Sequence, residues 1–362
     1  MDIFTKAFAG KRVLVTGHTG FKGSWLSVWL TRLGAEVTGY ALAPEQEPNH
    51  FSLLALEKRI HHIVGDIRDS AKLGEAFAHA RPEIVFHLAA QALVRKSYAN
   101  PVETFDVNVR GSANVLDAAR NSDSVRTLVY ITSDKCYHNN EQVWSYRECD
   151  SLGGHDPYSA SKACAELLFS SYQDSYFRER GLNAASARAG NVIGGGDWSK
   201  DRIVPDCIRA LCGDRRIELR NPTATRPWQH VLEPLSGYML LAALLESTEG
   251  KNYRGSWNFG PHTEDCRTVL EVTRTIASHW DARGADITFD KGPFPHEAML
   301  LQLNWEKALA GLHWKPTWTF PEGIAQTASW YQRWHNGEDV WQITSSQIDA
   351  FSLAFLRKRD AA

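Results

Sequence analysis

Residues 13–23 read VLVTGHTGFKG, an apolar run that leads into three glycines at three-residue steps. These glycines are Gly17, Gly20 and Gly23, and a helical pattern follows over residues 24–33. Glycine lets a backbone approach a dinucleotide pyrophosphate closely, and the free N–H groups at a helix start favour its negative charge. The order of strand, glycine turn and helix therefore predicts dinucleotide binding near the start of the chain.

The chain continues as an alternation of short apolar runs and longer helical patterns. The apolar runs lie at residues 12–16, 36–40, 84–88 and 128–133. The helical patterns lie at residues 72–80, 104–120 and 158–180. This alternation predicts an α/β fold with a Rossmann-like, doubly wound parallel sheet whose helices cover both faces.

After about residue 188 the pattern loosens into stretches rich in glycine, proline and tryptophan. We expect residues 1–188 to form the dinucleotide-binding domain and to carry the catalytic residues. Residues 189–362 are expected to form mainly a smaller C-terminal substrate-binding lobe, with some segments returning to the first domain. The last dozen residues are predicted to form a helix.

Composition excludes several classes of protein. The 40 basic and 42 acidic residues give a net charge of −2, so no overall basic field exists to bind nucleic acid. No apolar stretch reaches the roughly 18 residues of a membrane span. The six cysteines form no CxxC pair and no metal-ligand spacing, and no signal peptide is apparent. We expect a cytoplasmic protein without a bound metal.

Two motifs carry candidate chemistry. Tyr158 and Lys162 are four residues apart and so share one face of a helix, where the lysine charge can lower the pKa of the phenol. Ser133, Asp134 and Lys135 end the run 128–133, at the carboxyl edge of the sheet where open α/β folds bind ligands. Both motifs are thus predicted to meet in one crevice.

The glycine spacing, Tyr158-x-x-x-Lys162 and Ser133 together resemble the extended branch of the short-chain dehydrogenase/reductase family. The likeness continues through residues 153–158, 188–198, 226–234 and 292–298 and spans essentially the whole chain. Asp134-Lys135 resembles the pattern of the CDP-glucose 4,6-dehydratases, since dTDP- and GDP-sugar dehydratases typically carry Asp-Glu there.

The resemblance implies a lyase that uses NAD as an internal hydride shuttle. It would convert CDP-D-glucose to CDP-4-keto-6-deoxy-D-glucose and water, as in deoxysugar biosynthesis for lipopolysaccharide O-antigen. It also implies that Ser133 orients the substrate hydroxyl, Tyr158 is the base for the carbon-4 hydroxyl, and Lys162 holds the nicotinamide ribose.

Asp134, held protonated, is then expected to donate to the departing carbon-6 hydroxyl. Lys135 is expected to remove the carbon-5 proton if burial and Lys162 depress its pKa. The alternative for Lys135 is an electrostatic helper paired with Asp134.

Further residues are expected to bind the cofactor. The full set is Gly17, Gly20, Phe21, Lys22, Gly23, Asp66, Ile67, Leu88, Ala89, Ala90, Tyr158 and Lys162. Lys22 can also be interpreted as a 2′-phosphate partner or as half of a surface ion pair. The alternative for Asp66 is a loop Asp that caps the helix at Lys72. Because residues 37–40 end without an acidic residue, the residues alone leave NAD versus NADP open, and the resemblance favours NAD.

The substrate is expected to contact four positions. Asn191 and Arg226 match family positions at the diphosphate, where an arginine can bind in a two-pronged way. Arg202 is expected near the nucleobase and His296 near the phosphates, each against the alternative of a surface or core role.

Two helical patterns bear on how the chain assembles. Residues 104–120 and 158–180 resemble the helix pair that the family packs into an intermolecular four-helix bundle, which implies a homodimer or a dimer of dimers. The competing functions are a 4-epimerase, another nucleotide-sugar 4,6-dehydratase, and a non-catalytic NAD-binding protein. Asp134-Lys135 disfavours the epimerase and the GDP-mannose dehydratase, and the intact Tyr158 and Lys162 disfavour the non-catalytic protein.

Overall fold

The strand before the glycine loop lies inside a seven-stranded sheet of order β11-β6-β5-β4-β1-β2-β3. The computed structural model describes residues 2–213, 216–280, 286–290, 292 and 300–360. All neighbouring strands of this sheet run parallel. The strands are β1 (Arg12–Thr16), β2 (Glu36–Ala41), β3 (His61–Val64), β4 (Ile84–His87), β5 (Thr127–Ile131), β6 (Asn183–Ala189) and β11 (Gly255–Phe259).

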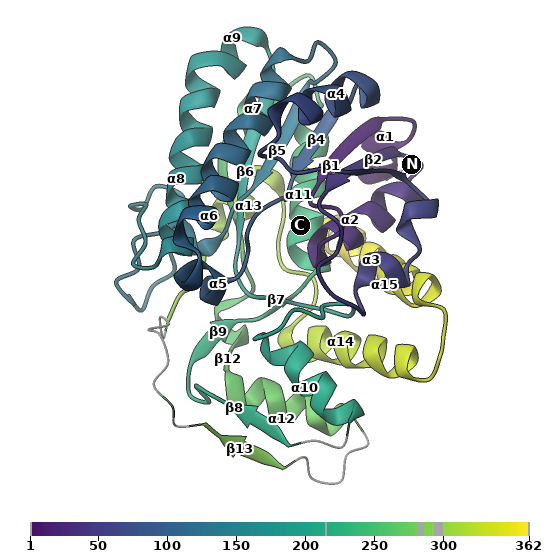
Figure 1. Cartoon of the computed structure of the whole chain (residues 1–362), viewed down its shortest axis with the longest axis vertical. Helices are drawn as coiled ribbons and strands as arrows, with labels where there is room; N and C mark the ends of the chain where they lie inside the picture. The colour runs from purple at the N-terminus through teal and green to yellow at the C-terminus, as the bar shows by residue number, and fades with distance from the viewer. Residues whose placement is uncertain (1, 214–215, 281–285, 291, 293–299, 361–362) are drawn as a thin grey trace.

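Helices cover both faces of the sheet (Figure 1). One face carries α4 (Ser70–Ala80), α7 (Ser112–Asn121) and α8 (Pro157–Tyr172). The other carries α1 (Ile3–Phe8), α2 (Phe21–Arg32), α11 (Leu232–Leu245) and α15 (Val340–Asp360). Side chains alternate between the two cores, since Val13 and Val15 join one and Leu14 joins the other. The predicted doubly wound parallel sheet is confirmed.

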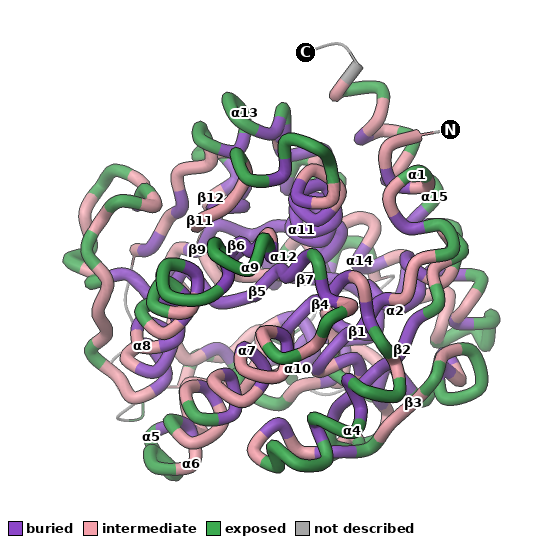
Figure 2. Tube along the Cα trace, turned by 90° about the horizontal axis from the view of Figure 1, so that it is seen from above, coloured by how far each residue is buried: buried purple, intermediate pink, exposed green. Residues whose placement is uncertain are grey.

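Because helices cover both faces, most strands of the sheet are buried, and the outer faces of the helices are exposed (Figure 2). Strand order reverses between β1 and β4, so the loops after these two strands diverge. A doubly wound sheet binds its ligand at such a point, outside the carboxyl ends of the strands.

Two of the predicted helices contain π-helical turns. The helix expected at 104–120 comprises α6 (Pro101–Phe105), a π segment (Asp106–Gly111) and α7. The helix expected at 158–180 comprises α8, a π segment (Gln173–Phe177) and α9 (Arg178–Arg180). The helix expected at 72–80 lies within α4.

A smaller region below the main sheet in Figure 1 contains three two-stranded pairs. They pair β7 (Val192–Ile193) with β10 (Gln229–His230), β9 (Thr225–Pro227) with β12 (Cys266–Thr268), and β8 (Ile217–Leu219) with β13 (Ile287–Phe289). Helices α10 (Ile203–Cys212), α12 (Val269–His279) and α14 (Phe320–His335) pack beside them. The remaining α-helices of the described ranges are α3 (His50–Leu53), α5 (Val94–Ala99) and α13 (Glu306–Leu312).

Residues beyond 188 contribute to both parts of the fold. Strand β11 is an edge strand of the main sheet, and α11 packs on that sheet between the two parts of the molecule. Within the described residues, no helix is long and apolar enough to cross a bilayer.

Candidate active site

The glycine loop has the geometry that requires glycine. Gly17 has a φ of +77°, and a Cβ built there would stand 2.7 Å from the amide nitrogen of Ala89. A Cβ on Gly23 would stand 2.2 Å from the carbonyl oxygen of Gly17, so the helix can lie close against the loop. Gly20 is the N-cap of α2 and brings no side-chain cap, which leaves N–H groups at this helix start available to an anion.

The loop after β4 borders this site. Leu88, Ala89 and Ala90 are each partly exposed next to Gly17. His87, just before them, is a core residue: its Nδ1 lies 2.7 Å from Thr16 Oγ1 and its Nε2 lies 3.0 Å from Ser112 Oγ. Burial lowers the pKa of His87 to about 3, so this ring is neutral.

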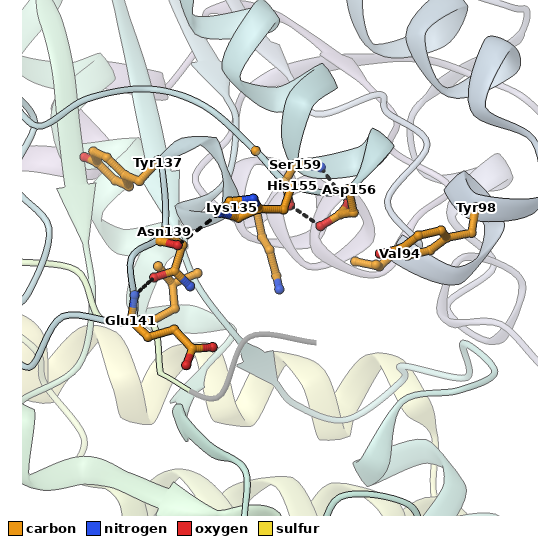
Figure 3. Close-up of a pocket in the computed structure, with 11 residues that line it drawn as sticks. Val94, Tyr98, Lys135, Tyr137, Asn139, Glu141, His155, Asp156 and Ser159 are labelled. Carbon is orange, nitrogen blue, oxygen red and sulfur yellow. Dashed lines mark hydrogen bonds between the residues drawn. The ribbon is translucent and has the colours of Figure 1, made fainter. Parts of the chain in front are cut away.

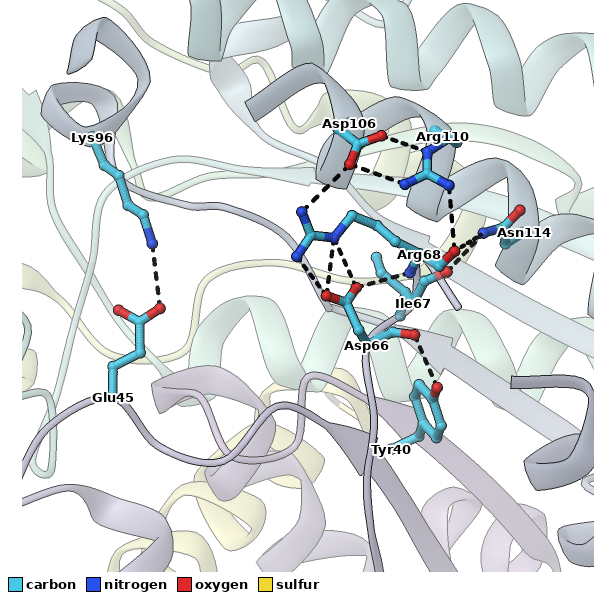
Figure 4. A network of polar contacts seen from close by, with 9 residues as sticks. All are labelled: Tyr40, Glu45, Asp66, Ile67, Arg68, Lys96, Asp106, Arg110 and Asn114. Carbon is cyan, nitrogen blue, oxygen red and sulfur yellow. Dashed lines mark hydrogen bonds and ion pairs between the residues drawn. The ribbon is translucent and has the colours of Figure 1, made fainter. Parts of the chain in front are cut away.

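Asp66 belongs to a charged network at the end of β3 (Figure 4). Its two carboxylate oxygens accept hydrogen bonds from Arg68, with Nη2 at 2.6 Å from Oδ2 and Nε at 3.0 Å from Oδ1. These bonds hold the pKa of Asp66 below its usual value. The aspartate that caps the helix at Lys72 is Asp69, so helix capping does not account for Asp66. The side chain of Ile67 is buried against Gly111.

Tyr158 and Lys162 lie on one face of α8, as predicted, with the Lys162 ammonium 5.9 Å from the centre of the phenol ring. Both side chains are buried. Burial raises the pKa of Tyr158 to about 12, although a hydrogen bond with Ser133 and the charge of Arg202 act in the opposite direction. The expected lowering of the phenol pKa is not found, because desolvation is the largest influence and the cation that opposes it is Arg202, not Lys162.

Asp134 has the environment of a carboxylic acid that keeps its proton. It is 3% exposed, and burial raises its pKa. Its Oδ1 accepts a hydrogen bond from Ser133 Oγ at 2.9 Å. Its Oδ2 is buried without a hydrogen-bond partner in the described part of the chain. This arrangement suits a proton donor whose acceptor arrives with the substrate.

Lys135 is only half-buried, which differs from the burial that its expected role assumed. It lines a cavity of about 480 Å³ between α5, the start of α8 and the segment after β5 (Figure 3). The cavity is also lined by Val94, Tyr98, Tyr137, Asn139, Glu141, Gly154, His155, Asp156, Ser159 and Leu301. Its walls combine apolar side chains with polar groups such as Asn139, Asp156 and Ser159, and this mixture suits a hydroxylated ligand.

The Lys22 ammonium lies close enough to Asp134 and Lys162, two of the predicted catalytic residues, for their charges to act on it. Its ammonium lies 6.0 Å from the centre of the Tyr238 ring. Burial and the charge of Arg202 lower the pKa of Lys22 to about 8, while Asp134 raises it. An adenosine 2′-phosphate would be expected beside the end of β2, so this placement favours a pyrophosphate contact over the two other interpretations of Lys22.

Three of the four predicted substrate residues lie in segments near Asp134 and Tyr158. Arg202 forms an ion pair with Asp197 at 3.1 Å, and its charge acts on the pKa of Tyr158. Arg226 is buried on β9 and donates to the Thr225 carbonyl at 2.8 Å. Asn191 follows β6, and its carbonyl accepts a hydrogen bond from the Gln229 amide. His296 lies outside the described residues.

Comparison with known proteins places the chain in a family. The model of the family described as GDP-mannose 4,6 dehydratase matches residues 14–327. The chain belongs to this family. It is 46% identical over 353 residues to the CDP-glucose 4,6-dehydratase of Salmonella typhimurium, a match that covers 96% of this chain and 98% of that protein.

Solved structures show that this member of the GDP-mannose 4,6-dehydratase family shares its fold with related enzymes. The Thermus thermophilus UDP-glucose 4-epimerase in complex with NAD matches with a TM-score of 0.76 at 27% identity, over 88% of this chain and 98% of that one. A dTDP-glucose 4,6-dehydratase from Streptomyces venezuelae with NAD bound also matches with a TM-score of 0.76, at 22% identity, over 91% and 99% of the two chains.

Sequence reasoning on this family member missed several polar residues that contact the catalytic segments. Glu166 and Arg188 form an ion pair at 2.6 Å directly behind the site. The available signal for Glu166 was its position four residues after Lys162, on the same face of α8. Gly190 was also missed, although a Cβ there would touch the free oxygen of Asp134.

Proposed function

We propose that the chain is a CDP-D-glucose 4,6-dehydratase, which converts CDP-D-glucose to CDP-4-keto-6-deoxy-D-glucose and water. The observation that carries this proposal is the near-full-length similarity to the Salmonella CDP-glucose 4,6-dehydratase. The site supports it, because a buried acid and a neighbouring amine accompany the tyrosine and lysine of an oxidation site. Oxidation alone would need neither Asp134 nor Lys135.

We propose NAD as the cofactor. The Thermus and Streptomyces structures hold NAD, and the glycine loop here offers close backbone approach at Gly17 and Gly23. The residues proposed to hold NAD are the cofactor-binding residues predicted from the sequence. They lie in the glycine loop, around Asp66, around Leu88 and, with Lys162, on α8. When bound, the oxidised nicotinamide accepts a hydride from the sugar and later returns it, so no net oxidation results.

In the first half of the reaction, Tyr158 as phenolate accepts the proton of the carbon-4 hydroxyl, which Ser133 orients. Arg202 and the hydrogen bond with Ser133 favour the phenolate against the burial that raises the pKa of Tyr158. Loss of this proton, as hydride leaves carbon 4, gives a 4-keto sugar. The ketone acidifies the hydrogen on carbon 5.

In the second half, Lys135 removes the proton on carbon 5, and Asp134 donates its proton to the departing carbon-6 hydroxyl. The hydroxyl leaves as water, hydride adds to carbon 6, and Lys135 returns its proton to carbon 5. The proton taken by Tyr158 replaces the one that Asp134 lost. The balance is loss of one water. The partly exposed position of Lys135 on the cavity wall supports exchange of its proton with solvent.

The substrate diphosphate is proposed to contact Asn191 and Arg226, and the two further substrate residues are Arg202 and His296. A boundary near residue 188 between cofactor-binding and mainly substrate-binding parts stays a prediction. In support, Arg226 lies on β9 and Asn191 directly precedes β7, and both strands belong to the region below the main sheet in Figure 1.

We further propose that the chain forms a homodimer, or a dimer of dimers, through the helices that span residues 104–120 and 158–180, which begin in α6 and α8. These helices pack against each other and carry exposed apolar side chains, with Val102 at 82% and Leu167 at 60% exposure. Apolar side chains grouped on neighbouring helices favour burial against a partner. A cytoplasmic location is proposed as well, and the six free cysteines support a reducing compartment.

The test is incubation of the protein and NAD with CDP-, dTDP-, UDP- and GDP-linked glucose, followed by mass spectrometry. CDP-glucose should lose one water, and the Tyr158→Phe variant, which keeps the packed ring, should leave it intact. An unchanged mass with a new sugar isomer would identify an epimerase instead. Loss of water from another nucleotide-glucose alone would correct the nucleotide.

A further inference from the structure

A fully buried ion pair lies behind the site and takes no part in the proposed chemistry. Arg188 on β6 and Glu166 on α8 are joined at 2.6 Å, and their side chains are 3% and 1% exposed. Burial alone would raise the pKa of Glu166, but Arg188 and hydroxyl donors hold it below its usual value. Glu166 is therefore a buried anion matched by a buried cation.

Glu166 is the acceptor of a cluster of hydroxyl groups. Thr132 Oγ1 donates to its Oε1 in a short hydrogen bond. Its Oε2 accepts from Ser186 at 2.9 Å and from Ser256 at 3.3 Å, in addition to Arg188. Through these bonds the carboxylate joins α8 to the end of β5, to β6 and to β11.

Arg188 uses its other arm on a different residue of the catalytic segment. Its Nη1 donates to Tyr137 Oη at 2.7 Å, and Tyr137 in turn donates to Asn258 Oδ1 at 2.8 Å. Arg188 also donates to the Glu148 carbonyl at 3.3 Å. The Tyr137 phenol is thus fixed between β6 and β11.

The two bonded residues stand at the two ends of the segment that carries the proposed catalytic groups. Thr132 precedes Ser133, and Tyr137 follows the short helical turn Asp134–Cys136. Glu166 sits on the helix that carries Tyr158 and Lys162. The ion pair therefore holds the Thr132 end of residues 132–137 against the helix that supplies the base, and it holds the Tyr137 end against β6 and β11.

Stability alone does not explain such a pair. Desolvation of two charges costs about as much as their attraction returns, and apolar residues of similar size often serve as well. A reaction with two chemical steps needs Asp134 and Lys135 held in register with Tyr158, and misplacement by about 1 Å can cost roughly a hundredfold in rate.

We infer that Glu166 and Arg188 are positioning residues that align the 132–137 segment with Tyr158 and Lys162. This inference rests on the proposed function. Because the two ends of the segment are held separately, they should fail separately. Loosening the Tyr137 end displaces Asp134 and Lys135 and slows loss of water, while Ser133 stays anchored by Thr132. Loosening the Thr132 end displaces Ser133 and slows oxidation at carbon 4 as well.

The test separates the two steps in single turnovers of the NAD-loaded enzyme with CDP-glucose. Absorbance of reduced nicotinamide reports oxidation, and mass spectrometry of quenched samples reports loss of water and uptake of solvent deuterium at carbon 5. Tyr137→Phe should lose water roughly tenfold more slowly, with oxidation within about twofold of wild type. Thr132→Val should slow both steps.

Tyr146→Phe is the matched control. Its ring stacks on Tyr137 at 5.2 Å, but its hydroxyl donates to Asn139 and lies outside the network. It should keep the wild-type ratio of the two rates at a similar melting temperature. If Tyr137→Phe does not fold, Arg188→Lys, whose single ammonium keeps the ion pair with Glu166 but loses the second bond to Tyr137, should show the same selective loss.

The outcomes are distinguishable. If wild-type protein removes water from CDP-glucose and Tyr137→Phe keeps the same ratio of rates as Tyr146→Phe, the positioning role is wrong and the proposed function stands. If the wild type removes no water, the proposed function fails and this inference falls with it.

Discussion

The free carboxyl oxygen of Asp134 faces Gly190, where an added Cβ would stand 2.9 Å from Oδ2. This oxygen has no hydrogen-bond partner within the described ranges of the chain. Burial fixes the carboxyl group, so it has little room to turn away from a methyl group. The absence of a side chain at position 190 therefore keeps open the face from which Asp134 can donate its proton.

Gly190→Ala should for this reason reduce formation of the dehydrated product by roughly tenfold or more while the fold is retained. The check is steady-state product formation together with a thermal melt. Gly74→Ala is the matched control, because Gly74 lies on α4 with nothing within 4 Å of an added Cβ. The control should keep full activity and gain up to about 1 kcal/mol of stability. Full activity in Gly190→Ala would contradict the role given to this face of Asp134.

Asp134→Asn should make the cofactor-free chain more stable and the NAD-loaded enzyme less active. The buried carboxyl group has a raised pKa, so folding near neutral pH must either bury its charge or take up a proton, and either costs free energy that the amide does not. We expect a gain of about 1 kcal/mol in urea unfolding at pH 7, as is common when a functional buried charge is removed.

The pH dependence of this gain has a definite sign. The folded chain binds the Asp134 proton more tightly than the unfolded chain, so wild-type stability falls as pH rises from 3.8 through the raised pKa. The advantage of Asp134→Asn should therefore grow over that range. A variant less stable than wild type at pH 7 would mean that Asp134 is needed for the fold.

Lys162→Met tests the second buried charge in the alkaline range. Burial lowers the pKa of Lys162 from 10.5 to about 8, so between these values the unfolded chain binds more protons and wild-type stability rises with pH. The lysine contributes at most about 1.4 kcal/mol per pH unit. Unfolding of both proteins at pH 8, 9 and 10 should show the advantage of the variant shrinking. By calorimetry the variant should also bind NAD more weakly, and unchanged affinity would remove the cofactor role.

The sequence predicted the parts of the fold that have strong local patterns. The β1 run and the glycine loop were found because β-branched residues precede three glycines. β6 was missed because residues 183–189 read NAASARA, small side chains with weak strand preference that only burial between β5 and β11 makes into a strand. β11 was missed because its partner in the sheet, β6, lies far away in the sequence.

The candidate site was predictable where spacing reports geometry, as for Tyr158 and Lys162 on one helix face. Three other features depend on tertiary contacts that spacing does not report. These are the partial exposure of Lys135, the ion pair of Glu166 with Arg188, and the contact of Gly190 with Asp134. The raised pKa of the Tyr158 phenol was not predicted for a related reason, since the desolvation that raises it follows from packing.

The proposed dimer is tested by the mass of the protein in solution. Light scattering at micromolar concentration should give at least twice the 40.6 kDa mass of one chain. Leu167→Glu, which places a charge on the outer face of α8, should reduce this to the single-chain mass. Leu353→Glu on α15 is the control, because it changes a leucine of similar exposure, 53%, on another helix. A wild type of 40.6 kDa would contradict the dimer.

In the proposed reaction one site oxidises carbon 4, eliminates water across carbons 5 and 6, and reduces carbon 6 without net redox change. The most direct measurement uses CDP-glucose deuterated at carbon 4, incubated with the NAD-loaded protein in ordinary water, with the product analysed by NMR and mass spectrometry. We expect a 4-keto-6-deoxy product that has lost one water and carries the deuterium on carbon 6. Deuterium that returns to carbon 4 in a sugar of unchanged mass, or that is lost to solvent, would contradict it.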